Sequence, residues 1–201
     1  MLNSATEYLQ TLADLLSRVE VTDRNNSSQP LNDSAREAVA MIGSVREAGG
    51  KIMLIGNGGS ASIASHIQND LCKAVGVRTL VFNEQPLLTA LANDDGYGSV
   101  FEMPVQLWSN QHDLLFAISS SGRSENILRA VSAASSRGCR VVTLSGFCTD
   151  NPLRRLGDLN FYVPSESYGH VELTHSTLLH FLTDSAAVEW NSPAVTSAIT
   201  A

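Results

Sequence analysis

Two kinds of hydrophobic pattern divide the chain into an N-terminal part and a longer remainder. In the first part, apolar residues recur at intervals of three and four, which predicts a helix over residues 2–20. A polar stretch with a proline, residues 23–30, predicts a loop. A second helix follows, capped by Asp33 or Ser34 and stopped by the glycine pair at 49–50.

In the remainder, short continuous apolar runs separate stretches of helical spacing. The five runs are residues 51–55, 78–82, 114–118, 141–144 and 159–163. Short apolar runs that alternate with helices indicate βαβ units, in which helices cover both faces of a parallel sheet. A last helix is predicted over 170–189. We therefore expect an α/β protein with an N-terminal helix and loop (1–32), a main domain (33–190) and a loose C-terminal tail (191–201).

Composition narrows the classes of partner. The 201 residues are 43% hydrophobic and 16% charged, which is typical of a globular chain. Acidic residues number 20 and basic residues 13, and no dense basic run marks a nucleic-acid binder. No apolar run reaches the ~18 residues of a membrane helix, and the first residues lack a signal-peptide pattern. Three cysteines match no metal or disulfide spacing, so we expect free thiols and a cytoplasmic protein without nucleic-acid or membrane partners.

Two loops that follow predicted strands have the composition of a ligand cradle. Residues 56–62 read Gly-Asn-Gly-Gly-Ser-Ala-Ser, where glycines permit close approach of a ligand but also suit an ordinary strand-to-helix turn. Residues 119–124 read Ser-Ser-Ser-Gly-Arg-Ser and precede a helix. Ligands of open α/β sheets bind at the carboxyl ends of strands, and hydroxyls at a helix start suit a phosphate dianion. The alternative is a serine-rich helix cap.

Four ionisable residues are candidates to converge on a site. His66 and Asp70 are four apart on one predicted helix, so they share a face. Glu172 and His180 are eight apart on the last helix, roughly 80° from each other around its axis. A histidine with a carboxylate supplies an acid and a base, and the same groups bind Zn²⁺. A hydrogen-bonded structural role is the alternative for each of them, and it is our interpretation of His112 and His175.

These motifs together resemble a known family. The segments 56–60 and 119–124 look like the two signatures of the sugar isomerase (SIS) domain. More closely, the chain is similar to phosphoheptose isomerases over about residues 35–190. That similarity includes Ala-Asn-Asp-Asp-Gly-Tyr at 92–97 and the helix that runs through Glu172 to His180.

The resemblance implies a five-stranded parallel sheet between helices, with N-terminal helices that assemble a homotetramer. It implies a phosphate pocket and a sugar site, and it makes Asp70 and His180 the catalytic pair. The phosphate pocket would comprise Ser119, Ser120, Ser121 and Ser124, with Ser60 nearby; the sugar site would comprise Asn57, Gly58, Gly59, Asn93, Asp94 and Glu172. In some members Zn²⁺ is held at the positions of His66, Asp70, Glu172 and His180.

Two residues depart from the better-known members, which have Glu at position 70 and Gln at position 172. Asp70 is one methylene shorter, and Glu172 adds a negative charge that favours a cation. The expected reaction is aldose–ketose isomerisation of sedoheptulose 7-phosphate to D-glycero-D-manno-heptose 7-phosphate, for heptose-containing glycans. The alternative is a non-catalytic SIS protein that binds a phosphosugar or a partner such as a replication initiator.

Overall fold

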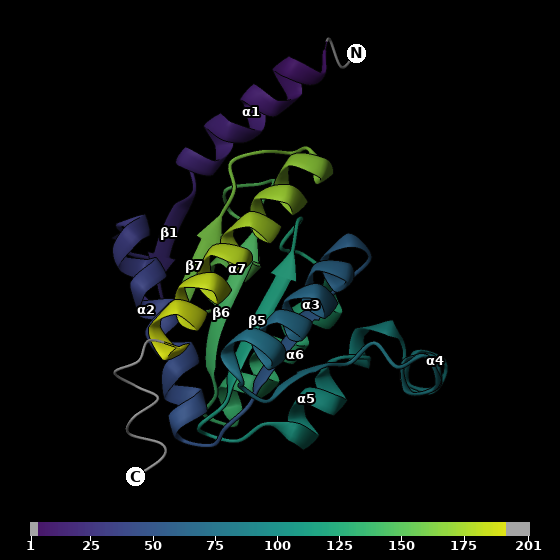
Figure 1. Cartoon of the computed structure of the whole chain (residues 1–201). Coiled ribbons are helices and arrows are strands. Elements are labelled where there is room, and N and C mark those ends of the chain that lie inside the picture. Colours follow the sequence, from purple (N-terminus) through teal and green to yellow (C-terminus); the bar gives the residue numbers. More distant parts are fainter. Residues whose placement is uncertain (1–3, 192–201) are drawn as a thin grey trace.

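A seven-stranded sheet forms the centre of the fold in the computed structural model, which describes residues 4–191 (Figure 1). Along the sheet the strands follow the order β2-β1-β7-β6-β5-β3-β4. The strands are β1 (Glu20–Asp23), β2 (Ser28–Gln29), β3 (Ile52–Gly56), β4 (Thr79–Val81), β5 (Leu114–Ser119), β6 (Arg140–Ser145) and β7 (Leu159–Tyr162). The last five are parallel to one another, which confirms the five predicted strands.

The parallel strands are apolar on both faces because helices cover both. In β3, Ile52 and Leu54 point into one core, and Met53 and Ile55 point into the other. The first core includes residues of α2 (Leu31–Glu47), α3 (Gly59–Asp70) and α7 (Tyr168–Asn191). The second includes residues of α4 (Gln85–Asp94), α5 (Glu102–Trp108) and α6 (Glu125–Ser136). Three short helices complete the connections: η1 (Leu71–Val75), η2 (Tyr97–Ser99) and η3 (Pro152–Arg155).

Strands β1 and β2 were not expected, since the sequence pattern predicted a loop over residues 23–30. The pair is short and polar, so it lacks the apolar alternation that marks a strand. Its turn is held by Asp23, whose carboxylate accepts from the backbone N–H groups of Asn25 and Ser27. β1 then pairs antiparallel with β7, so the N-terminal segment contributes two strands to the sheet edge.

The N-terminal helix α1 (Ala5–Ser17) extends beyond the sheet, as Figure 1 shows. The Tyr8 ring stacks on the ring of His170 in α7, with centroids 4.1 Å apart. Leu15 is the buried residue of α1, whereas Leu9 is 62% exposed. Part of the predicted apolar stripe is therefore uncovered in the single chain.

The sequence also predicts a loose C-terminal tail over residues 191–201 and the absence of a membrane-spanning helix. Nearly all of the predicted loose tail lies outside the described residues. Within residues 4–191, no helix has the length and hydropathy needed to cross a lipid bilayer.

Candidate active site

The serine loop connects the carboxyl end of β5 to the first turn of α6. Ser119 is the last residue of β5, and its hydroxyl donates to the Ser124 hydroxyl at 3.4 Å. Gly122 closes the loop with a positive φ of 61°, and its N–H donates to the Ser119 carbonyl. A side chain at this position would collide with Asn151, so the turn requires glycine for space as well as for conformation.

One hydroxyl of this loop is buried without a partner. Ser120 is 5% exposed, and its Oγ has no hydrogen-bond partner among the described residues. Buried hydroxyls in folded proteins nearly always find a partner. A hydroxyl without a protein partner, in a loop that leads into the first turn of α6, fits a loop that receives an anionic oxygen.

The glycine-rich segment 56–62, here called the glycine loop, lies beside the serine loop because β3 and β5 are neighbours in the sheet. Gly56, the last residue of β3, pairs in register with Ile118, one residue before the serines. Asn57 follows, and its amide exchanges two hydrogen bonds with the amide of Asn126 in α6, at 3.0 and 2.9 Å. Ser60 is buried in the first turn of α3. The structure thus brings the two predicted loops to one edge of the sheet.

A second group of side chains lies on the outer surface formed by α3 and α7. The Asp70 carboxylate lies between two imidazoles, 3.6 Å from Nε2 of His66 and 3.4 Å from Nδ1 of His180. The two rings meet edge to face with centroids 4.8 Å apart. One ligand atom from each of these residues lies within 4.8 Å of the others, so the three can hold one metal ion. Two imidazoles and a carboxylate form a donor set that suits Zn²⁺.

Glu172 lies apart from these three residues. Its carboxylate packs against Gly59 at the start of α3, where a Cβ on Gly59 would come within 2.4 Å of Oε2. Eight residues separate Glu172 from His180, a rise of about 12 Å along the helix. Helices α3 and α7 pack together and run in the same direction, so Glu172 is beside the glycine loop and His180 is beside Asp70. Glu172 as a fourth metal ligand remains a prediction from the resemblance.

Asn93 and Asp94 are the last two residues of α4, and no hydrogen bond joins either side chain to the two loops within the described residues. The Asn93 amide donates to Asp94 at 2.8 Å, and both residues are exposed. The link from this segment to the loops is Tyr97, whose hydroxyl donates to Oδ1 of Asn57 at 2.9 Å.

His175 has the structural environment that the sequence interpretation assigned to it. It is fully buried in α7, with Nε2 3.1 Å from the carbonyl oxygen of Ser145 at the end of β6. Burial lowers the pKa of His175 to about 4, and the Ser145 carbonyl offsets part of that effect. This neutral histidine anchors α7, the helix that presents Glu172 and His180.

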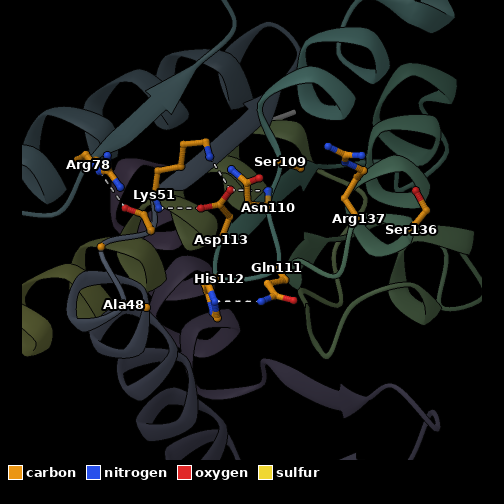
Figure 2. A pocket seen from close by; sticks show the side chains of 12 residues that line it. Ala48, Lys51, Arg78, Ser109, Asn110, Gln111, His112, Asp113, Ser136 and Arg137 are labelled. Atoms are coloured by element: carbon orange, nitrogen blue, oxygen red, sulfur yellow. Dashed lines mark hydrogen bonds and ion pairs between the residues drawn. The ribbon is translucent and has the colours of Figure 1, made fainter.

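A cavity of about 640 Å³ lies at the opposite edge of the sheet, where β3 and β5 begin (Figure 2). Its centre is the Lys51–Asp113 ion pair, at 2.6 Å, with Asp113 1% exposed. Asp113 also accepts from the backbone N–H groups of Lys51 and Asn110. With these contacts Asp113 braces the loop before β5, and none of the predicted site residues lines this cavity.

Sequence reasoning missed Asn126 and Tyr97. Asn126 is two residues after Ser124, in the first turn of a helix, where Asn ordinarily reads as a capping residue. Tyr97 sits in a turn and is 54% exposed. The contacts of both with Asn57 cross 69 and 40 residues of sequence, so neither has a local signal.

Comparison with known proteins identifies the class that this fold and site define. The model of the SIS domain family matches residues 7–146, and the chain belongs to that family. The phosphoheptose isomerase of Helicobacter pylori is 32% identical over 164 residues, covering 79% of this chain and 85% of the relative. That of Syntrophotalea carbinolica is 28% identical over 193 residues, covering 92% and 93%. Within the SIS domain proteins the chain is a phosphoheptose isomerase family member, and hence an isomerase.

The solved structures agree with this assignment. The structure of a phosphoheptose isomerase from Francisella tularensis matches with a TM-score of 0.78 at 26% identity, over 90% of this chain and 95% of that one. The resemblance expected from the two loop motifs is thereby confirmed, together with the α/β fold.

Proposed function

We propose that this protein interconverts sedoheptulose 7-phosphate and D-glycero-D-manno-heptose 7-phosphate. The observation that carries the proposal is the Asp70 carboxylate between His66 and His180 on a chain that also keeps the serine loop. A protein that only binds a phosphosugar or a partner has no need of this acid–base cluster. The names of the relatives support the same reaction.

The serine loop is proposed to hold the phosphate. Ser120 contributes a hydroxyl with no protein partner, and Ser121 and Ser124 contribute partly exposed hydroxyls at the start of α6. The α6 N-terminus adds a favourable dipole. A phosphate fixed at one end of the sugar chain limits the positions that C1 and C2 can take, so its binding energy serves to orient the reacting atoms.

Asp70 and His180 are proposed to move the protons. In the ketose-to-aldose direction, C1 loses a proton while the C2 oxygen gains one, which gives an enediol. A proton then returns to C2 while the C1 oxygen loses its proton, and the aldose results. Each transfer needs a base and an acid within hydrogen-bond reach, and a carboxylate 3.4 Å from an imidazole provides both.

A Zn²⁺ ion is the metal we propose for this cluster, held by His66, Asp70 and His180. When bound, it would polarise the sugar carbonyl and stabilise negative charge on its oxygen. Glu172 stands at a position that holds the metal in some family members, but in this structure its carboxylate lies against Gly59. The reaction is proposed to take place in the cytoplasm.

We further propose a homotetramer. Leu9 on α1 and Phe181 and Val188 on α7 are 62%, 54% and 75% exposed, and exposed apolar faces of this kind mark protein contacts. Multi-angle light scattering at micromolar concentration tests the assembly. A mass near four times 21.5 kDa is expected, and a mass near 21.5 kDa would contradict it.

The decisive test of function is a panel of five-, six- and seven-carbon ketose phosphates, with the aldose product followed by NMR. We expect turnover of the seven-carbon ketose. The His180→Gln variant should lose activity by roughly 10²–10⁴-fold, because glutamine cannot exchange a proton near neutral pH. The Asp70→Asn variant should lose activity by a similar factor.

His112→Gln is the matched control, because His112 is exposed at the opposite edge of the sheet. It should retain wild-type turnover. Bound zinc, measured by mass spectrometry, should fall in His180→Gln and stay unchanged in the control. A folded His180→Gln protein with near-normal turnover would remove His180 from the mechanism and favour the non-catalytic alternative.

A further inference from the structure

We propose that Asn126 is a positioning residue that fixes the orientation of the Asn57 amide, so that Asn57 donates a hydrogen bond to an oxygen of the sugar. Asn126 is 2% exposed in the first turn of α6, and Asn57 is the residue that follows the end of β3. The inference rests on the proposed function, since it assigns the residue that prepares one contact of the same site.

The two amides form a reciprocal pair. Nδ2 of Asn57 donates to Oδ1 of Asn126 at 3.0 Å, and Nδ2 of Asn126 donates to Oδ1 of Asn57 at 2.9 Å. Tyr97 adds a third bond, its hydroxyl donating to Oδ1 of Asn57 at 2.9 Å. Asn126 is the buried member of this group, so a lost bond would leave one of its polar atoms unpaired, and that cost holds the two amides in one orientation.

The polarity of this pair is set by the backbone. The N–H of Ile127 donates to Oδ1 of Asn126 at 3.0 Å, and a backbone N–H can only donate. The oxygen of Asn126 must therefore face Ile127, and the same oxygen then accepts from Asn57. The nitrogen of Asn126 in turn faces the oxygen of Asn57. The Asn57 amide therefore has one orientation, which is fixed by the Ile127 N–H through Asn126.

One donor of Asn57 remains available. A side-chain amide offers two N–H donors and an oxygen with two lone pairs. The oxygen of Asn57 accepts from Asn126 and from Tyr97, and one N–H is donated to Asn126. The second N–H has no partner among the described residues, and Asn57 is only partly buried. This N–H group can donate to a hydrogen-bond acceptor, and on a sugar phosphate a carbonyl or hydroxyl oxygen is such an acceptor.

The same contacts join three segments that come from separate parts of the chain. Asn57 belongs to the glycine loop, Asn126 follows the serine loop, and Tyr97 follows the end of α4, which carries Asn93 and Asp94. A change at Asn126 should therefore disturb sugar binding while the serine loop still accepts phosphate.

The test is the isosteric variant Asn126→Asp. Its carboxylate still accepts from Ile127 and from Asn57, but its second oxygen faces the oxygen of Asn57 and repels it. We expect kcat/KM for sedoheptulose 7-phosphate to fall at least tenfold. On an Asn57→Ala background, the same substitution should change kcat/KM less than twofold, because Asn126 acts through Asn57. Asn110→Asp, an exposed asparagine at the opposite edge, is the control and should match wild type.

Tyr97→Phe removes one bond from an exposed side chain, so it keeps the inference testable if Asn126→Asp does not fold. We expect a loss of threefold or more that also disappears on the Asn57→Ala background. Either variant near wild type, or an undiminished loss on the Asn57→Ala background, would overturn the positioning role.

A readout without substrate separates this inference from the proposed reaction. In ¹⁵N NMR spectra, the side-chain amide signal of Asn57 should shift in Asn126→Asp and in Tyr97→Phe, and stay unchanged in Asn110→Asp. An isomerase assay that fails for the wild type would refute the reaction alone. An unshifted Asn57 signal would refute the positioning role whatever the reaction.

Discussion

Acid should destabilise this protein through His175. The imidazole is fully buried, Nε2 donates to the Ser145 carbonyl, and Nδ1 has no partner among the described residues. A second proton on this ring would place a charge in the core without an acceptor. Burial accordingly lowers the pKa from 6.5 to about 4.

The sign of the effect follows from proton binding. Because the folded-state pKa is depressed, the unfolded chain binds the proton more readily between pH 6.5 and about pH 4. The stability contribution is fully present above pH 6.5 and is lost as the pH falls through that window. Across the whole interval, the free energy of unfolding falls by roughly 3 kcal/mol, of which about 2 kcal/mol is already lost at pH 5.

Urea unfolding at pH 7 and pH 5 measures this loss against His175→Gln, which keeps a donor near Ser145 but does not titrate. With a dependence on urea of about 2 kcal/mol per molar, the wild-type midpoint should fall about 1 M further than the variant's. Both proteins are measured at one concentration, because assembly contributes to apparent stability. Equal falls for the two proteins would show that His175 does not hold a depressed pKa.

Two further predictions concern the serine loop. Ser121→Ala combined with Ser124→Ala should weaken binding of the sugar phosphate at least tenfold, at about 1.5–3 kcal/mol per hydrogen bond to a charged group. Calorimetric titration measures this loss, and wild-type affinity in the double variant would place the phosphate elsewhere. Gly122→Ala should lower stability by about 1–2 kcal/mol for the left-handed backbone alone. Displacement of buried Asn151 adds to that loss. Thermal melting tests it, and an unchanged melting temperature would mean that the loop relaxes freely.

The sequence by itself determined the parallel part of the sheet. Each of the five apolar runs forms one strand, and the four inner strands β3, β5, β6 and β7 are buried almost throughout, so the local pattern matches their environment. Strand β4 lies at the edge of the sheet and is half-buried. The sequence did not determine β1 and β2, whose stability comes from pairing with β7 and from the turn at Asp23. Short polar strands of this kind exist only where a neighbouring edge is available.

The candidate site divides in the same way. A spacing of four on one helix already placed His66 beside Asp70, and the two loop motifs already lay at strand ends. Only the packing of α3 along α7 decided that His180 reaches Asp70 while Glu172 lies against Gly59. Only the neighbouring positions of β3 and β5 decided that Asn57 meets Asn126. Contacts between segments far apart in sequence depend on which surfaces pack, and no local pattern of residues contains that information.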